Sequence, residues 1–247
     1  MADFELKDKT IMITGGSSGI GKMTALLCAE QGAKVIILGT NEERLEQVLC
    51  SMKGTGHRKI VYNLIEHTDY SSLFDDIVKK DGKLDGLVHC AGINGVYPLR
   101  AVKKEQMNRV MGVHFYAFVE LVKQYSKKKN SSGGSIVGVS STSANIGEVC
   151  QTVYSAAKGA MDAAARCMAV ELIPKGIRVN IVKPGMIRTE MMEHVLEMGS
   201  KVEALGAVSY MGIGEPQDVA NAILFLLSDM SKHTSGREIF VDGCAFR

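Results

Sequence analysis

A tyrosine and a lysine, Tyr154 and Lys158, stand four residues apart in a segment with helical periodicity. Residues at this spacing lie on one face of an α-helix, so their phenol and ammonium groups would be neighbours. Reduction of a carbonyl needs a hydride on carbon and a proton on oxygen, and a phenol can supply that proton if its pKa falls from about 10 toward neutrality. An ammonium group ~6 Å away would favour the phenolate by about 3 kcal/mol, or roughly two pKa units. The pair therefore predicts acid–base chemistry at a carbonyl or alcohol.

The spacing alone is not specific, because it recurs in Tyr125 and Lys129, which are predicted to be solvated residues at a polar helix end. What distinguishes Tyr154 is Ser141, which precedes it by 13 residues and follows the predicted strand Ser135–Val139. Ligands of open α/β sheets bind at the carboxyl ends of the strands. A serine hydroxyl there can bind the substrate oxygen as charge develops on it. The structural alternative is a serine that caps a turn.

A glycine-rich segment, Thr14–Gly21, follows the first apolar run and precedes a periodic helical segment. Its glycines allow a tight turn and a close approach to a pyrophosphate, to which the next helix offers free amides and the positive end of its dipole. The spacing departs from G-x-G-x-x-G, and strand-to-helix turns also attract glycine for steric reasons. We nevertheless predict a dinucleotide site, with these contacts: Gly15, Ser17, Ser18, Gly19, Ile20 and Gly21.

Short apolar runs alternate with helix-length periodic segments along the chain. The predicted strands are Thr10–Thr14, Lys34–Leu38, Ile60–Leu64, Leu84–His89, Ser135–Val139, Val179–Val182 and Ile239–Val241. The predicted helices are Ile20–Gln31, Glu42–Lys53, Tyr70–Lys80, Lys103–Lys128, Thr152–Leu172 and Pro216–Ser228. Apolar strands separated by helices predict an α/β fold, a doubly wound parallel sheet with helices on both faces. The Gly/Ser-rich stretch 130–134 is predicted to be a loop, and we expect one domain over residues 1–247.

Composition narrows the class of protein. With 46% hydrophobic and 23% charged residues among 247, the chain is predicted to be globular with a large core. Its formal charge of +2 gives no field for nucleic acid or an anionic membrane. The sequence has no ~18-residue apolar run, and its N-terminus lacks the apolar core of a signal peptide. The six cysteines form no C-x-x-C pair, so we expect no metal and a cytoplasmic protein.

These motifs resemble, in their order and spacing, those of the short-chain dehydrogenase/reductase family in its compact form. The family's T-G-x-x-x-G-x-G loop, N-N-A-G segment, R-V-N…P-G…T segment and G…V-D-G signature have counterparts here. Both asparagines of N-N-A-G are replaced. The resembling segments are Thr14–Gly21, His89–Gly92, Arg178–Asn180 with Pro184, Gly185 and Thr189, and Gly236 with Val241–Gly243.

The resemblance implies a Rossmann-like fold, catalysis by Ser141, Tyr154 and Lys158, and a homo-oligomer, either a tetramer or a dimer. Residues from about 186 to 213, which are rich in methionine, are expected to form a lid over a small-molecule carbonyl or alcohol substrate. Beyond the glycine loop, the implied cofactor contacts are Thr40, Asn41, Asn63, Leu64, Cys90, Ala91, Gly92, Tyr154, Lys158, Pro184, Gly185, Ile187 and Thr189.

Cofactor choice in such folds is decided at the end of the second strand, where an acidic residue binds the ribose 2′-hydroxyl of NAD. Gly39 stands at that position. Thr40 resembles the threonine of some 3-oxoacyl carrier-protein reductases that use NADPH, and Arg44 lies one helical turn further on. These residues favour NADP, with NAD as the alternative.

Three of the departures from the family pattern bear on turnover: Cys90, His114 in place of a usual asparagine, and Ile213 in place of an arginine. His114 could preserve a proton relay through its main-chain carbonyl, or it could be a hydrogen-bonded buried histidine. The departures leave open a protein of another class, a dinucleotide-binding sensor or interaction protein that has lost turnover.

Overall fold

The computed structural model describes residues 4–197 and 209–245. The described residues form one parallel sheet of seven strands in the order β3-β2-β1-β4-β5-β6-β7. The first strand of the chain, β1 (Thr10–Thr14), pairs with β2 (Lys34–Gly39) on one side and with the central strand, β4 (Leu84–His89), on the other. The chain winds outward in opposite directions from this point. The carboxyl ends of β1 and β4 therefore flank the crevice in which such sheets bind their ligands.

The outer strands complete the sheet. β3 (Arg58–Val61) forms one edge, and β5 (Ser131–Val139), β6 (Ile177–Pro184) and β7 (Glu238–Val241) extend the other side. The strands near the centre are almost wholly buried, which explains why they read as continuous apolar runs instead of alternating ones.

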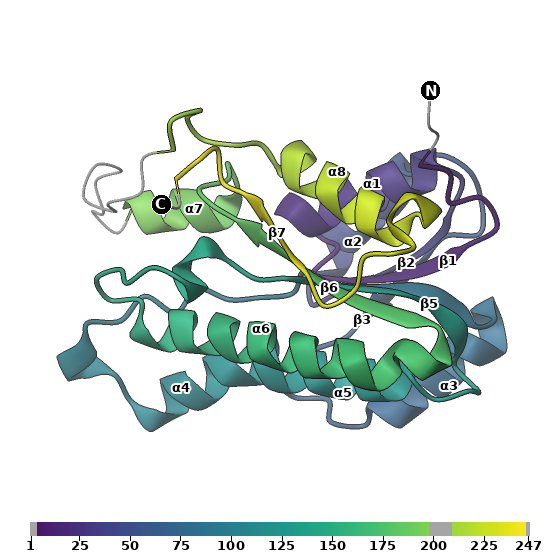
Figure 1. Cartoon of the computed structure of the whole chain (residues 1–247), viewed down its shortest axis with the longest axis horizontal. Helices are drawn as coiled ribbons and strands as arrows, with labels where there is room; N and C mark the ends of the chain where they lie inside the picture. Colours follow the sequence, from purple (N-terminus) through teal and green to yellow (C-terminus); the bar gives the residue numbers. More distant parts are fainter. Residues whose placement is uncertain (1–3, 198–208, 246–247) are drawn as a thin grey trace.

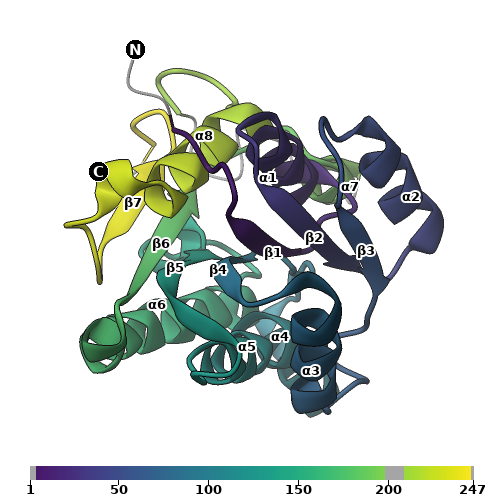
Figure 2. The same cartoon turned by 90° about the vertical axis from the view of Figure 1, so that its right-hand side faces the viewer.

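Helices cover both faces of the sheet, as the side-on view in Figure 2 shows. The helices on one side are α1 (Gly19–Glu30), α2 (Glu42–Ser51), α8 (Pro216–Leu227) and, at the carboxyl edge, α7 (Glu190–Glu197). On the other side lie α3 (Tyr70–Asp81), α4 (Lys104–Met111), α5 (Ala117–Tyr125) and α6 (Thr152–Leu172). Alternate strand residues serve two separate cores: Met12 faces the second group of helices and Ile13 the first. The predicted doubly wound, Rossmann-like sheet is confirmed.

The predicted helix Lys103–Lys128 is wrong as a single α-helix. α4 and α5 are joined by a π-helical turn, Gly112–Tyr116, which buries Val113 and His114. The Val113 carbonyl accepts a hydrogen bond from the His89 ring at 3.0 Å. Such turns often occur at functional sites, and this one places His114 beside the carboxyl end of β4.

The prediction of a loop over residues 130–134 is also wrong, because β5 begins at Ser131. A side chain at Gly134 could not be accommodated there, since its Cβ would lie 2.1 Å from the Asp85 carbonyl oxygen. Tyr125 packs against this stretch, and its hydroxyl donates to the Gly133 carbonyl at 2.9 Å. Tyr125 is therefore buried, and the prediction that it is solvated is wrong. The glycines thus serve close packing.

The bounds of β3 differ from the predicted Ile60–Leu64. The strand ends at Val61, after which Asn63 and Leu64 turn toward the centre of the carboxyl edge and line a cavity there. β6 extends two residues beyond the predicted Val179–Val182 at each end.

Candidate active site

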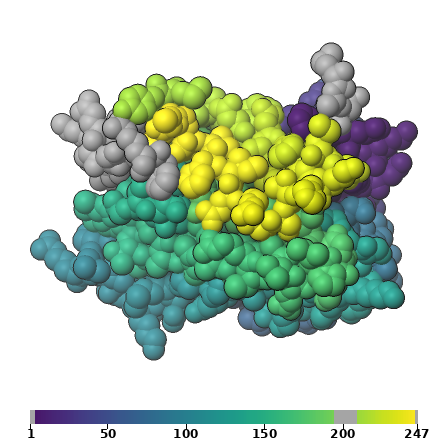
Figure 3. All heavy atoms as spheres, viewed as in Figure 1, coloured from purple at the N-terminus to yellow at the C-terminus, as the bar shows by residue number. Residues whose placement is uncertain are grey.

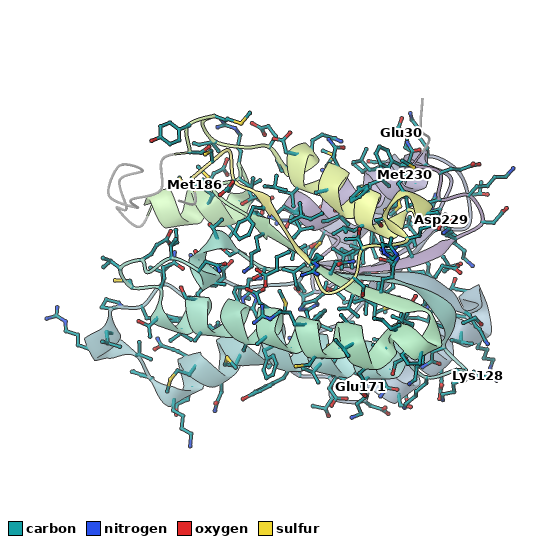
Figure 4. All side chains as sticks on the ribbon, in the orientation of Figure 1. Glu30, Lys128, Glu171, Met186, Asp229 and Met230 are labelled. Carbon is teal, nitrogen blue, oxygen red and sulfur yellow. The ribbon has the colours of Figure 1, made fainter. Side chains whose placement is uncertain are left out.

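Two cavities open at the carboxyl edge of the sheet, one of about 370 Å³ and one of about 210 Å³. Cys90, which follows β4 directly, lines both of them. Met186 lines the smaller cavity, and Figure 4 shows it beside α7, at the opposite end of the molecule from Asp229 and Met230. The larger cavity contains the glycine loop and the smaller one contains the predicted catalytic residues.

The glycine loop is packed too closely for larger residues. A Cβ at Gly15 would lie 2.7 Å from the Ala91 amide nitrogen, and one at Gly21 would lie 2.2 Å from the Gly15 carbonyl oxygen. Ser18, the N-cap of α1, makes no side-chain hydrogen bond to the described helix, and the first turn has no acidic residue. The amides and the positive dipole end of α1 therefore suit an anion in the adjoining cavity.

Most of the predicted cofactor residues on this side of the sheet line the larger cavity. They are Gly15, Ser17, Ser18, Gly21, Thr40, Asn63, Leu64, Cys90, Ala91 and Gly92. The sequence did not indicate several further lining residues, which come from elements brought here by the fold: Tyr62, Ile65, Ile93, Arg109 and Val113. Gly19 instead approaches Thr189, since its Cβ would lie 3.3 Å from the threonine Cγ2.

Two of the residues expected near the 2′ position are engaged in other contacts. The Asn41 side chain caps α2 by accepting a hydrogen bond from the Arg44 amide at 2.9 Å. The Arg44 guanidinium pairs with Glu190 of α7 at 2.6 Å. Gly39 and Thr40, by contrast, line the larger cavity. The structure therefore does not bring Asn41 or Arg44 to the cavity wall.

Ser141, Tyr154 and Lys158 all line the smaller cavity. Ser141 follows β5 and caps a short 3₁₀ turn, Thr142–Ala144. Its hydroxyl donates to the Ser143 hydroxyl at 3.1 Å and accepts from the Ser143 amide at 3.1 Å. The expected cofactor contacts that join them here are Ile20, Pro184, Gly185, Ile187 and Thr189.

Lys158 is buried in the second turn of α6. Its ammonium donates to the Val139 carbonyl at 2.7 Å and lies 5.6 Å from the centre of the Tyr154 ring. Burial lowers the pKa of Lys158 to about 8, against the opposing influence of Asp162 and Cys90. The ammonium form therefore predominates below about pH 8.

The pKa of Tyr154 differs from the expectation of a depressed value. Burial raises it to about 12; a hydrogen bond with Ser141 opposes this shift, while the charge of Glu148 adds to it. The Lys158 ammonium, which was expected to lower this pKa, donates to the Val139 carbonyl. The phenol therefore holds its proton at neutral pH, as a general acid must.

His114 lies edge-on to the Tyr154 ring, with the ring centres 5.3 Å apart. Its Nε2 is 2.9 Å from the Ile93 carbonyl oxygen, and its Nδ1 has no hydrogen-bond partner among the described residues. Burial and the charge of Lys158 hold its pKa well below the usual range, so the ring is neutral. A Cβ at Gly92 would lie 2.5 Å from the His114 ring, which explains the glycine. The side chain fits the description of a hydrogen-bonded buried histidine.

The smaller cavity has polar residues that the sequence did not single out: Asn94, Ser143, Glu148 and Gln151. The only signal in the sequence was position: Ser143, Glu148 and Gln151 lie between Ser141 and Tyr154, and Asn94 follows the segment His89–Gly92. Ser143 links Ser141 to Glu148, because its hydroxyl donates to the Glu148 carboxylate at 3.4 Å. Burial raises the pKa of Glu148, and the Ser143 hydrogen bond opposes this shift.

The expected lid is described only in part. Met186, Met191 and Met192 line the smaller cavity, whereas Met211 is 84% exposed. Residues 198–208 of the expected lid lie outside the described residues. Arg178 does not reach the site; its guanidinium donates to main-chain carbonyls such as that of Leu226 at 2.8 Å.

Within residues 4–197 and 209–245, no three His, Cys, Asp or Glu side chains come together as a metal site would require. Over the same ranges, no helix has the length and apolar character needed to cross a membrane.

Comparisons with known proteins agree with this geometry. A family model described as enoyl-(acyl carrier protein) reductase matches residues 15–244. The chain is 35% identical over 243 residues to 3-oxoacyl-[acyl-carrier-protein] reductase FabG of Thermotoga maritima. This alignment covers 96% of this chain and 98% of the relative. It is 31% identical over 242 residues to cyclopentanol dehydrogenase of Comamonas testosteroni, and this alignment covers 96% of this chain and 97% of the relative. The solved structure of 7α-hydroxysteroid dehydrogenase complexed with NADH and 7-oxo glycochenodeoxycholic acid matches with a TM-score of 0.91 and 30% identity, covering 98% of this chain and 96% of that one.

Proposed function

Because the chain belongs to the short-chain dehydrogenase/reductase family of oxidoreductases, we propose that it transfers hydride between a nicotinamide dinucleotide and a carbonyl or secondary alcohol, with Tyr154 handling the proton. One observation carries this proposal. Ser141, Tyr154 and Lys158 converge in a cavity that adjoins the cavity of the glycine loop. A substrate in the first cavity and a dinucleotide extending from the second would meet at Cys90.

The residues present fit a dinucleotide. The glycine loop and the first turn of α1 would hold the pyrophosphate, because their amides are free of acidic neighbours. Thr40 and Asn63 would face the adenosine half, while Pro184 and Gly185 would face the nicotinamide half. The dinucleotide, when bound, supplies or accepts the hydride. NADP is the proposed preference, since Gly39 offers no carboxylate to repel a 2′-phosphate.

The chain's own residues would manage the oxygen atom of the substrate. The Ser141 hydroxyl would donate to this oxygen as it gains negative charge during reduction. Tyr154, which holds its proton at neutral pH, would then transfer that proton to the same oxygen. The Lys158 ammonium would stabilise the phenolate that remains.

The proposal is tested with a panel of ketones and alcohols offered with each dinucleotide, followed at the absorbance of reduced nicotinamide. We expect turnover of at least one carbonyl compound or alcohol. Dinucleotide binding without any turnover across the panel would favour the alternative, a sensor or interaction protein. The comparisons do not favour that alternative.

Glu148 is expected to select against anionic substrates. Among the described residues that line the smaller cavity, it is the only carboxylate, and the only cation, Lys158, already donates to the Val139 carbonyl. We expect Glu148→Gln to raise kcat/KM for a carboxylate- or phosphate-bearing substrate, relative to a neutral one, on the order of tenfold. The quantity to compare is the ratio of kcat/KM for the anionic substrate to kcat/KM for the neutral one. Glu148 also raises the pKa of Tyr154, but this effect is the same for both substrates and cancels in the ratio.

The matched control is Glu171→Gln, which removes the same charge near the C-terminal end of α6; Figure 4 shows Glu171 far from Met186, which lines the smaller cavity. Its ratio of anionic to neutral turnover should equal that of the unaltered protein. An unchanged ratio in Glu148→Gln would show that this carboxylate does not face the substrate.

We also propose that the protein is a cytoplasmic homo-oligomer, either a tetramer or a dimer, that binds neither nucleic acid nor membranes. The end of α6 exposes large apolar side chains, with Val170 73% and Ile173 60% accessible. Large apolar groups exposed together suit an interface between copies. Light scattering at micromolar concentration should give two or four times the chain mass of 26.7 kDa. A mass equal to that of one chain would contradict this assembly.

A further inference from the structure

Lys183, the residue before Pro184 in β6, is buried with 1% of its surface exposed. Its ammonium lies 2.7 Å from an Asp162 carboxylate oxygen and 2.6 Å from a Glu238 carboxylate oxygen, and it donates to the Asn145 side-chain oxygen at 2.5 Å. A lysine ammonium has three N–H donors. Each of them has a partner, and the partners belong to three different segments of the chain.

Two of these partners adjoin the proposed catalytic residues. Asp162 stands four residues after Lys158, one turn further along α6. Asn145 stands four residues after Ser141, where the 3₁₀ turn ends. Lys183 itself directly precedes the segment proposed to face the nicotinamide. Its ammonium therefore joins the segment of Ser141, the helix of Lys158 and the strand that leads to Pro184.

Stability alone does not account for this cluster. Removing an ammonium and two carboxylates from water costs several kcal/mol per ion, and apolar residues of similar volume often serve equally well. The cluster reaches the surface at Asn145, which is exposed, and at Glu238, whose side chain is 21% exposed. Figure 3 shows α6 and the C-terminal segment (yellow), which contains Glu238, lying side by side. There Arg166 donates to the second oxygen of Glu238 at 2.6 Å.

We propose that Lys183 is a positioning residue, which holds the Ser141 turn and the Lys158 turn of α6 in the relative placement that catalysis requires. The inference rests on the proposed function. Ser141 and Lys158 act on charge that develops during the reaction, and a displacement of about 1 Å can cost a large factor in rate. Most of the residues that line the two cavities lie outside these two turns, so the affinities for substrate and dinucleotide should depend little on this placement.

The first test is Lys183→Met, which keeps the length of the side chain and removes the charge. We expect kcat to fall about tenfold or more, while KM for the substrate and the Kd of the dinucleotide stay within about threefold. Calorimetry gives the dinucleotide Kd without turnover. Because the variant leaves Asp162 and Glu238 without their buried cation, its melting temperature is also expected to fall.

Two further variants separate positioning from stability. Asn145→Ala removes only the contact with the Ser141 turn, at an exposed residue, and should lower kcat several-fold with an unchanged melting temperature. The double variant Lys183→Met/Asp162→Asn removes both members of an ion pair and should recover melting temperature without recovering kcat. The control, Arg166→Gln, removes the exposed partner of Glu238 and should leave kcat unchanged.

The possible outcomes are distinct. The inference is overturned if the wild type turns over while kcat of both Lys183→Met and Asn145→Ala is unchanged. It is also overturned if the double variant recovers kcat together with melting temperature, because Lys183 would then act through stability alone. A wild type that binds dinucleotide but turns over no substrate would overturn the proposed function, and this inference with it.

Discussion

Replacement of Tyr154 by phenylalanine is expected to lower kcat by about 10²–10⁴-fold, the usual contribution of a positioned general acid. The phenol is the group proposed to transfer the proton, and it retains that proton at neutral pH because burial raises its pKa to about 12. The hydride and the proton must both be transferred for turnover. Loss of the proton donor therefore slows the reaction even when substrate and dinucleotide are bound.

The same substitution should preserve binding. Phenylalanine retains the ring that lies edge-on to His114, with 5.3 Å between the ring centres. The glycine loop lies in the adjoining cavity, so the Kd of the dinucleotide should change by no more than about threefold. Steady-state kinetics gives the first quantity and calorimetry the second.

The matched control is Tyr116→Phe, which removes a hydroxyl from an exposed tyrosine of the π-helical turn and should leave kcat unchanged. If Tyr154→Phe kept most of the wild-type kcat, the proton would have to come from another group. Ser141 and Glu148 line the same cavity and would then be the candidates.

The parts of the site that could be predicted from the sequence depend on local geometry. The glycine loop lies between a strand and a helix that adjoin it in the chain, and Tyr154 and Lys158 share a face because they are one helical turn apart. Ser141 could be placed because the strand before it ends at the carboxyl edge of the sheet. In each of these cases, a single element and its neighbour determine where the side chain lies.

Residues whose positions depend on packing between segments that are distant in the sequence could not be predicted. Arg109 lines the larger cavity from α4, and no spacing in the sequence connects it with the glycine loop on the opposite wall. Glycines 133 and 134 suggested a loop, whereas they allow β5 to pass closely against Asp85 and Tyr125. In the same way, Lys183 appeared to be an ordinary residue near the end of a strand. Its partners come from α6, from β7 and from the turn after Ser141, and no spacing in the sequence connects them.

Gly39→Asp is expected to reverse the preference between the two dinucleotides. We expect the wild type to bind NADPH more tightly than NADH, and added salt to reduce the difference. An aspartate at this position would accept hydrogen bonds from the ribose hydroxyls of NADH. It would repel a 2′-phosphate ~6 Å away by about 3 kcal/mol before screening, which should change the ratio of the two Kd values on the order of tenfold or more.

The structure can accommodate this aspartate. Gly39 lines the larger cavity, and a Cβ there would lie 3.3 Å from the Ser17 hydroxyl and 3.4 Å from a Leu45 methyl group, so these neighbours need to move by only a few tenths of an ångström. Gly39 is not among the glycines with positive φ, so the backbone tolerates a side chain. The fold should therefore survive and the effect should appear in binding.

Gly39→Asn is the matched control, since it adds nearly the same volume without the charge. If charge decides the choice, Asn should weaken both dinucleotides to a similar degree, whereas Asp should weaken NADPH alone. Arg44 gives a second check: it pairs with Glu190 at 2.6 Å, so Glu190→Gln should release its guanidinium and strengthen NADPH binding. Equal or tighter binding of NADH by the wild type would mean that Gly39 does not determine cofactor choice. Arg44 would then serve only to pair α2 with α7 across the carboxyl edge of the sheet.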